Sequence, residues 1–63
     1  MEDKIKLAVC ERFEDNVRFV DYEEGTKCYY LRFLHNSTFK IARLSKISKR
    51  IDIYNAEECI YVD

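Results

Sequence analysis

The sequence predicts a mainly β fold, arranged as one small antiparallel sheet. Apolar and polar residues alternate along several segments of the 63-residue chain, which is the period of a strand with one buried side. Tight-turn signals separate these segments at short intervals, and there is no long crossover connection of the kind that parallel strands need. This pattern is typical of a small antiparallel sheet or an open barrel of the SH3-like or Sm-like kind, with five or six strands.

A chain of 63 residues provides a single small domain, residues 1–63. Proline is absent and glycine occurs once, at Gly25, so no stretch has the composition of a linker. A domain of this size buries only about 60% of the surface that its unfolded chain exposes, and a second copy is a common source of extra stability. We therefore expect the chain to associate with itself or with a protein partner.

The first predicted strand lies near the amino terminus. Ile5, Leu7 and Val9 fall on one face of residues 4–12, and mainly polar residues fall on the other. Helical spacing fits the same segment almost as well, and the alternation favours the strand. The helical face would contain Ile5, Ala8, Val9, Arg12 and Phe13.

The pattern of turn and strand residues in the middle of the chain predicts a meander of strands. A turn at residues 15–16 leads into a strand over residues 17–22, and residues 23–26 form a second turn in which Gly25 can take the positive φ of a hairpin loop. The next strand, residues 27–34, is apolar on both faces. A strand of this composition is expected at the centre of a sheet or under a partner.

The segment that follows a third predicted turn, at residues 35–38, has two interpretations. Apolar residues of one parity indicate two strands, joined by a short helical turn near residues 45–49. The alternative is an α+β fold with a helix at about residues 40–51, because its isoleucines and leucine also gather on one side of a helical wheel. We favour the strands, and we expect a last strand at residues 58–62.

Charge is distributed unevenly along the chain, although the net charge is only -1. Residues 26–51 hold seven bases and no acid, residues 1–25 hold eight acids and four bases, and residues 52–63 hold four acids and no base. One interpretation is that the acidic segments lie beside the basic one in the sheet and form cross-strand pairs. The other is a nucleic-acid surface, in which cations contact phosphates and aromatic rings stack on bases. The candidates for that surface are Tyr29, Phe39, Lys40, Arg43, Lys46, Lys49 and Arg50.

The strand over residues 27–34 is also a candidate protein interface. Tyrosine and arginine are enriched at interface hot spots, and this strand carries both beside a second apolar face that needs a cover. The predicted function is therefore that of a small non-catalytic binding protein, of the inhibitor or accessory type that phages and mobile elements encode, acting on a protein partner or a second copy. A nucleic-acid-binding barrel is the alternative. The candidate interface residues are Cys28, Tyr30, Arg32 and Leu34.

The sequence contains no pattern that indicates catalysis. It has no nucleophile motif and no phosphate-binding glycine loop, so we expect neither enzyme activity nor a small-molecule substrate. The three cysteines and the single histidine lack the spacing of a zinc site, and no metal or cofactor is expected. No apolar run approaches the roughly 20 residues of a membrane-spanning helix, and no basic segment is followed by a long apolar stretch, so we expect neither a spanning helix nor a signal segment. We expect a cytoplasmic protein that does not contact a membrane.

Overall fold

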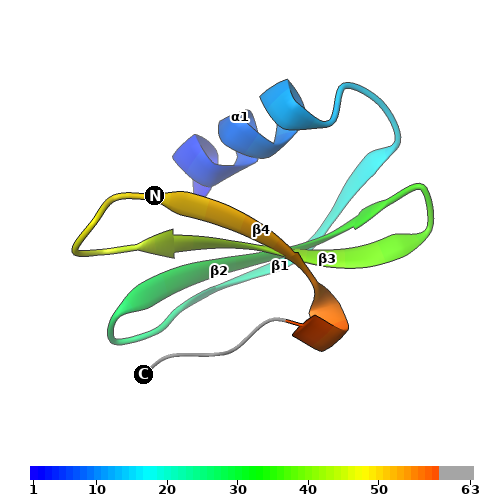
Figure 1. Ribbon diagram of the computed structural model, residues 1–63. Helices are drawn as coiled ribbons and strands as arrows, with labels where there is room; N and C mark the ends of the chain where they lie inside the picture. Colours follow the sequence, from blue (N-terminus) through cyan, green and yellow to red (C-terminus); the bar gives the residue numbers. More distant parts are fainter. Residues whose placement is uncertain (59–63) are drawn as a thin grey trace.

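The computed structural model describes residues 1–58, which form one α-helix packed on a four-stranded antiparallel sheet (Figure 1). The strands lie in the sheet in the order β1-β2-β3-β4, so each pairs with its neighbour in sequence. A single 3₁₀ turn follows the last strand. The elements are α1 (Glu2–Arg12), β1 (Val17–Glu24), β2 (Cys28–His35), β3 (Thr38–Ser45), β4 (Ile51–Asn55) and η1 (Ala56–Glu58).

The predicted first strand is wrong, because the amino-terminal segment forms α1. Ile5 and Val9, one helical turn apart, are both 0% exposed, whereas Leu7 is 62% exposed and points away from the sheet. Glu2 lies in the first turn and Arg12 in the last, where each charge interacts favourably with the helix dipole. Helical spacing, and not alternation, therefore describes this segment.

Phe13 ends α1 and connects it to the sheet. Its backbone is extended, with φ -121° and ψ 98°, and its N–H donates to the Val9 carbonyl over 2.8 Å. The Phe13 ring then lies 5.8 Å from that of Phe33 and 4.4 Å from that of His35, measured between centroids. The last turn of the helix is thus held against β2.

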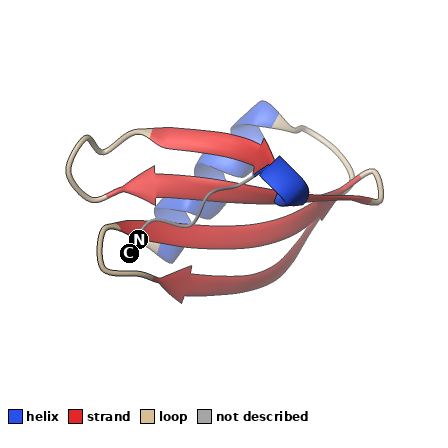
Figure 2. Ribbon diagram, turned by 60° about the horizontal axis from the view of Figure 1, so that its bottom comes forward, coloured by secondary structure: helices blue, strands red, loops and turns tan. Residues whose placement is uncertain are grey.

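The prediction of a small antiparallel sheet is confirmed, whereas the alternative of a barrel with five or six strands is wrong. Within residues 1–58 there are four strands, and β1 and β4 are the two edges (Figure 2). A barrel needs its first and last strands to pair, and the segment expected to supply the first strand is a helix. Instead of closing the sheet, α1 covers one face of it. No helix in the described residues is long and apolar enough to span a membrane.

The connections have positive φ at two asparagines, at Ser37 and, between β3 and β4, at Lys49, whose φ is 62°. Asn36 and Ser37 have φ of 50° and 67° in the β2–β3 turn, which confirms the turn predicted at residues 35–38. Asn16 has φ 62° in the turn predicted after the first element, and its side-chain amide donates to Asn36 Oδ1 over 2.9 Å. Gly25 does not have a positive φ, contrary to the prediction for the β1–β2 turn.

The strand interpretation of residues 39–51 is confirmed, and the helix at 40–51 is wrong. β3 runs to Ser45, and Ile41 and Leu44 are buried on opposite faces of the sheet. In an amphipathic helix, these two residues would lie on the same buried side. The next residues make a single helix-like turn, in which the Lys49 N–H donates to the Ser45 carbonyl over 3.0 Å. Of the strand predicted at 58–62, Glu58 belongs to η1, and residues 59–63 lie outside the described part of the chain.

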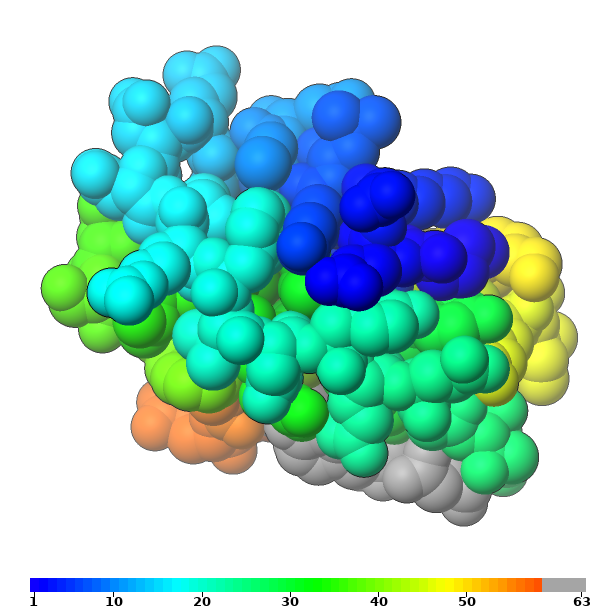
Figure 3. Space-filling model, turned by 180° about the vertical axis from the view of Figure 1, so that it is seen from behind, coloured from blue at the N-terminus to red at the C-terminus, as the bar shows by residue number. Residues whose placement is uncertain are grey.

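The core has two parts, one on each face of the sheet. The larger part lies between α1 and the sheet, and Val17, Phe19 and Tyr22 of β1 pack against it. Figure 3 shows α1 beside β1, where Lys6 Nζ lies 5.2 Å from the Phe19 ring centroid. The smaller part lies on the opposite face, against Ala56. Because both clusters include β2 residues, the expectation of an interior strand is confirmed for β2. The buried members are Ile5, Val9, Leu31, Phe33, Ala42 and Leu44 in the larger cluster, and Cys28, Tyr30 and Ile41 in the smaller.

Candidate interaction surface

The four candidate interface residues of β2 all lie on the face of the sheet that points away from α1, which we call the outer face. They are alternate residues of one strand, so their side chains share a face. Cys28 is 7% exposed and Tyr30 is 1% exposed, whereas Arg32 and Leu34 are partly exposed. A partner that binds the outer face can therefore contact Arg32 and Leu34. Cys28 and Tyr30 are buried and contribute to the packing beneath that face.

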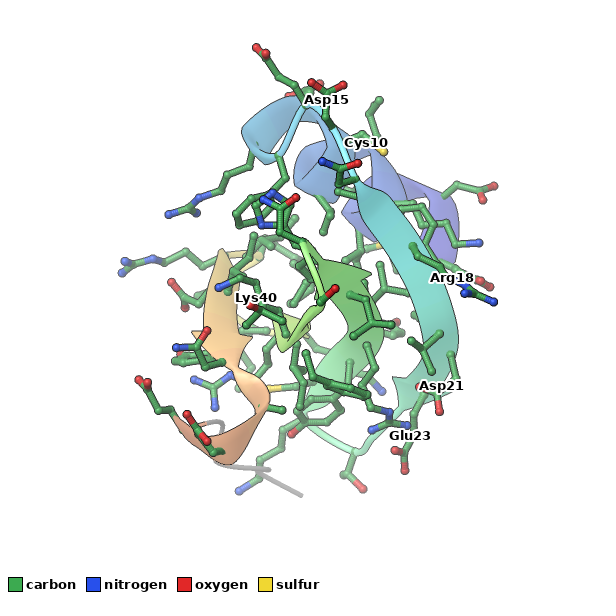
Figure 4. The ribbon with its side chains drawn as sticks, turned by 90° about the vertical axis from the view of Figure 1, so that its right-hand side faces the viewer. Cys10, Asp15, Arg18, Asp21, Glu23 and Lys40 are labelled. Atoms are coloured by element: carbon green, nitrogen blue, oxygen red, sulfur yellow. The ribbon has the colours of Figure 1, made fainter. Side chains whose placement is uncertain are left out.

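Arg32 is held by two carboxylates of β1. Its Nε donates to Asp21, and its Nη2 donates to Glu23 Oε1 over 3.1 Å. Both acids project from the same length of the β1 edge (Figure 4). These contacts are cross-strand pairs between an acidic segment and the basic middle, which is the arrangement that the charge layout suggested.

The structure distributes the seven nucleic-acid candidates over several surfaces. Tyr29 packs against the α1-side core, and Lys40 lies on the same side, on β3 (Figure 4). Arg43 and Phe39 lie on the outer face, because they alternate with Lys40 and Ala42 along β3. The remaining three candidates follow the end of β3. They are Lys46, Lys49 and Arg50.

Two of these cations contact groups within their own sheet. Lys40 Nζ donates to Asn55 Oδ1 over 2.8 Å and lies 5.8 Å from the Phe13 ring centroid. Arg43 Nη2 donates to the Tyr54 hydroxyl over 2.7 Å, and its guanidinium carbon lies 4.8 Å from the same ring. Sequence analysis missed Tyr54, because its contact with Arg43 depends on the β3–β4 register, in which Tyr54 lies opposite Ile41 and diagonal to Arg43.

Lys46 belongs to a cluster of charged and aromatic side chains near the β1–β2 turn. Its Nζ donates to Glu24 Oε2 over 2.8 Å and lies 5.0 Å from the Tyr29 ring centroid. The hydrogen bond to Glu24 raises the pKa of the Lys46 ammonium. Tyr22 stacks on Tyr29 with 6.2 Å between ring centroids. Desolvation by burial, followed by the electrostatic effects of Tyr29 and Glu24, raises the pKa of the Tyr22 hydroxyl.

The Tyr22 pKa predicts a loss of stability at alkaline pH. A tyrosine whose pKa is higher in the folded chain than in the unfolded chain contributes stability that is fully present below the unfolded pKa, about 10, and is lost as pH rises through the folded pKa. We expect Tyr22→Phe to remove that contribution and, with it, a tyrosinate absorbance component that titrates above pH 10. Absorbance titration of both proteins tests this. Superimposable curves, after scaling for one fewer tyrosine, would contradict it.

Leu34 and Phe39 form the accessible apolar part of the outer face. They pair directly across β2 and β3, and Phe39 is 40% exposed. Arg18 of β1 pairs with Leu34 on the other side, and an open cavity of about 470 Å³ is lined by Asn16, Arg18, Leu34 and other residues of that end of the sheet. The prediction assigned Phe39 to base stacking. Its position opposite Leu34 follows from the β2–β3 register.

The cysteines of the described chain are separated by the sheet. Cys10 is exposed on α1, and Cys28 is buried on the outer face. Within residues 1–58, no group of three or more histidine, cysteine, aspartate or glutamate side chains could hold a metal ion. The third cysteine, Cys59, lies outside the described residues.

Comparisons with known proteins give no information on the function of this chain. No protein-family model, no curated protein and no solved structure matches this chain. What can be stated of its class is that it is a small domain with an amino-terminal helix and a four-stranded antiparallel open sheet.

Proposed function

We propose that this chain is a small non-catalytic binding protein and that it contacts another protein chain through its outer face. The observation that carries the proposal is the cross-strand pair of Leu34 and Phe39, two apolar residues that lie directly opposite each other and stay accessible on the face that α1 does not cover. The exposed face of an antiparallel sheet ordinarily presents polar side chains. An apolar pair there favours a function in binding.

Charged side chains beside this pair would give the contact its specificity. Arg18 is exposed next to Leu34, and Arg32, one alternate position further along β2, is already oriented by Asp21 and Glu23. An arginine held in this way loses less side-chain entropy when a partner binds. An apolar centre with an ordered polar rim is the usual composition of a protein interface.

Substitutions at the accessible positions test the proposal. Tyr30 is a poor choice, because it is 1% exposed and its truncation would destabilise the fold itself. We expect Leu34→Ser or Phe39→Ser to weaken the complex by roughly thirtyfold, the effect of losing a hot spot worth about 2 kcal/mol. Leu7→Ser is the matched control, because Leu7 is an exposed apolar residue on the far side of α1.

Two measurements identify the partner. Sedimentation velocity of the pure protein over a wide concentration range detects a second copy, and the Phe39→Ser variant should then remain monomeric. A photo-crosslinking side chain at position 39, compared with one at position 7, detects another protein. If the chain stays monomeric and both positions cross-link to the same proteins with the same yield, the outer face is not an interface.

The nucleic-acid interpretation stays a prediction, and no contact in the described chain specifically favours it. The candidate cations are divided between the two faces, and Lys46 and Arg50 pair with Glu24 and Asp52. A single strand of nucleic acid needs a continuous positive groove. Protein binding is therefore the function that we propose.

A further inference from the structure

A cavity of about 420 Å³ lies where the start of β2, the end of β3 and the β3–β4 turn meet. It is a different region of the molecule from the Leu34 and Phe39 pair, which lies at the other end of β2 and β3. Five of its eight lining residues are basic or hydroxylic, and Cys28 and Ile47 add apolar surface. The side chains that matter here are Lys27, Arg43, Ser45, Ser48, Arg50 and Asp52.

The charges around this cavity do not cancel. Three cations line it and one carboxylate does, so its formal charge is +2 in a chain whose net charge is -1. Asp52 pairs with Arg50 over 3.7 Å, and Arg50 is nevertheless 79% exposed. The Lys27 ammonium has no ion-pair partner among the described residues. Basic residues from three separate segments thus converge on one site.

The two serines add hydrogen-bond donors to the same site. Ser45 Oγ accepts from the Ile47 and Ser48 backbone N–H groups, each over 3.3 Å, and Ser48 Oγ accepts from the Arg50 N–H over 3.3 Å. These bonds use lone pairs of the hydroxyl oxygens and fix their positions in the turn. Each hydroxyl hydrogen therefore stays available for donation to a ligand.

We propose that this cavity binds a phosphate group, either as inorganic phosphate or as a phosphate monoester. Guanidinium, ammonium and hydroxyl donors around one point match a compact anion that has several acceptor oxygens. A phosphate monoester carries up to two negative charges near neutral pH. These would balance the formal charge of +2 on the residues that line the cavity. This site can be tested separately from the proposed protein interface, because Leu34 and Phe39, which carry that proposal, do not line the cavity, although Cys28 and Arg43 of the outer face do.

A single phosphate group fits these observations better than a nucleic-acid strand does. Of the other basic residues between positions 26 and 51, Arg32 and Lys46 pair with carboxylates of β1, and Lys40 lies on the α1 side of the sheet, where it donates to Asn55. Lys27, Arg43 and Arg50 are the cations that line the cavity. A strand would need further cations to follow its backbone beyond one phosphate.

The test is an NMR titration of the ¹⁵N-labelled protein with inorganic phosphate, at constant ionic strength, with potassium chloride as the reference. Saturable shifts confined to the residues around positions 27–28 and 43–52 would support the site. O-phosphoserine is the second probe, and tighter binding than inorganic phosphate would assign the ligand as a monoester. Equal or weaker binding would assign it as the free anion.

Three variants, two in the β3–β4 turn and one at the start of β4, separate specific binding from general charge effects. Arg50→Gln should weaken phosphate binding by roughly tenfold, the loss of one charge-assisted hydrogen bond. Asp52→Asn should strengthen it, because the competing carboxylate is removed. Lys49→Gln is the control, since it changes the same charge in the same turn at an exposed residue that does not line the cavity. Circular dichroism of each variant verifies that the fold is retained.

Several results would overturn the proposal. They are shifts that do not saturate, shifts that chloride reproduces, or equal losses of affinity in Arg50→Gln and Lys49→Gln. A single-stranded oligonucleotide that binds more tightly than both phosphate probes would also overturn it, in favour of a nucleic-acid surface. None of these results would affect the test of the protein interface, which depends on Leu34 and Phe39.

Discussion

Replacing Phe33 with alanine should cost about 3–5 kcal/mol of the free energy of unfolding. Phe33 is 0% exposed and packs between α1 and the sheet, in contact with Phe13. A chain of 63 residues has a total stability of roughly 3–9 kcal/mol, so the variant should be largely unfolded in a protein at the lower end of that range. Urea denaturation followed by circular dichroism measures the difference.

Phe39→Ala is the matched control for this substitution. Phe39 lies on the neighbouring strand, but it is 40% exposed, so its truncation leaves no closed cavity. We expect it to cost less than about 1 kcal/mol, as partly exposed sites usually do. Similar losses from both substitutions would mean that the α1-side cluster is not the main core of the protein.

Ile5→Asp should detach α1 from the sheet and unfold most of the chain. Ile5 is 0% exposed, and burial of an unpaired carboxylate costs several kcal/mol. An isolated helix of the 11 residues of α1 is marginal in water, so its stability comes from packing. Without it, the apolar α1 side of the sheet meets solvent. The helical signal in circular dichroism and the cooperativity of thermal unfolding should both be lost.

Leu7→Asp introduces the same charge into the same helix two residues later. Because Leu7 is 62% exposed, we expect a change within about 0.5 kcal/mol. The pair of variants therefore compares the two interpretations of the amino-terminal segment directly. A strand with Ile5 and Leu7 on one buried face would respond to both substitutions, whereas α1 responds only to the first.

The amino-terminal segment shows where sequence reasoning reached its limit. Ile5, Leu7 and Val9 satisfy strand alternation, and Ile5 and Val9 also satisfy helical spacing, so the pattern alone could not exclude either structure. What distinguished them is tertiary: the buried pair faces a sheet that already has its four strands. The meander from residue 17 to 45 was predictable, because each strand there has turn residues at both ends and β2 is apolar on both faces.

The ion pairs could be predicted only as a general arrangement. The acidic and basic segments indicated cross-strand pairing, but the partners depend on a register shift in β1 between Phe19 and Asp21. Without that bulge, Val20 would lie opposite Arg32, because Phe19 pairs with Phe33. The irregularity moves Asp21 into that position, where its carboxylate contacts the Arg32 guanidinium. A one-residue bulge of this kind leaves no reliable mark in a single sequence.

The order of the strands also determines how quickly the chain can fold. Each strand pairs with the next one in sequence across residues 25–27, 36–37 or 46–50, so every pairing can extend from a short loop that closes early. Folding rates are higher when contacts are local in this sense. The chain also contains no proline, so no prolyl bond can produce a refolding phase of tens of seconds. Refolding should therefore proceed in one rapid phase, and the edges of the half-formed sheet would be exposed to other chains only briefly.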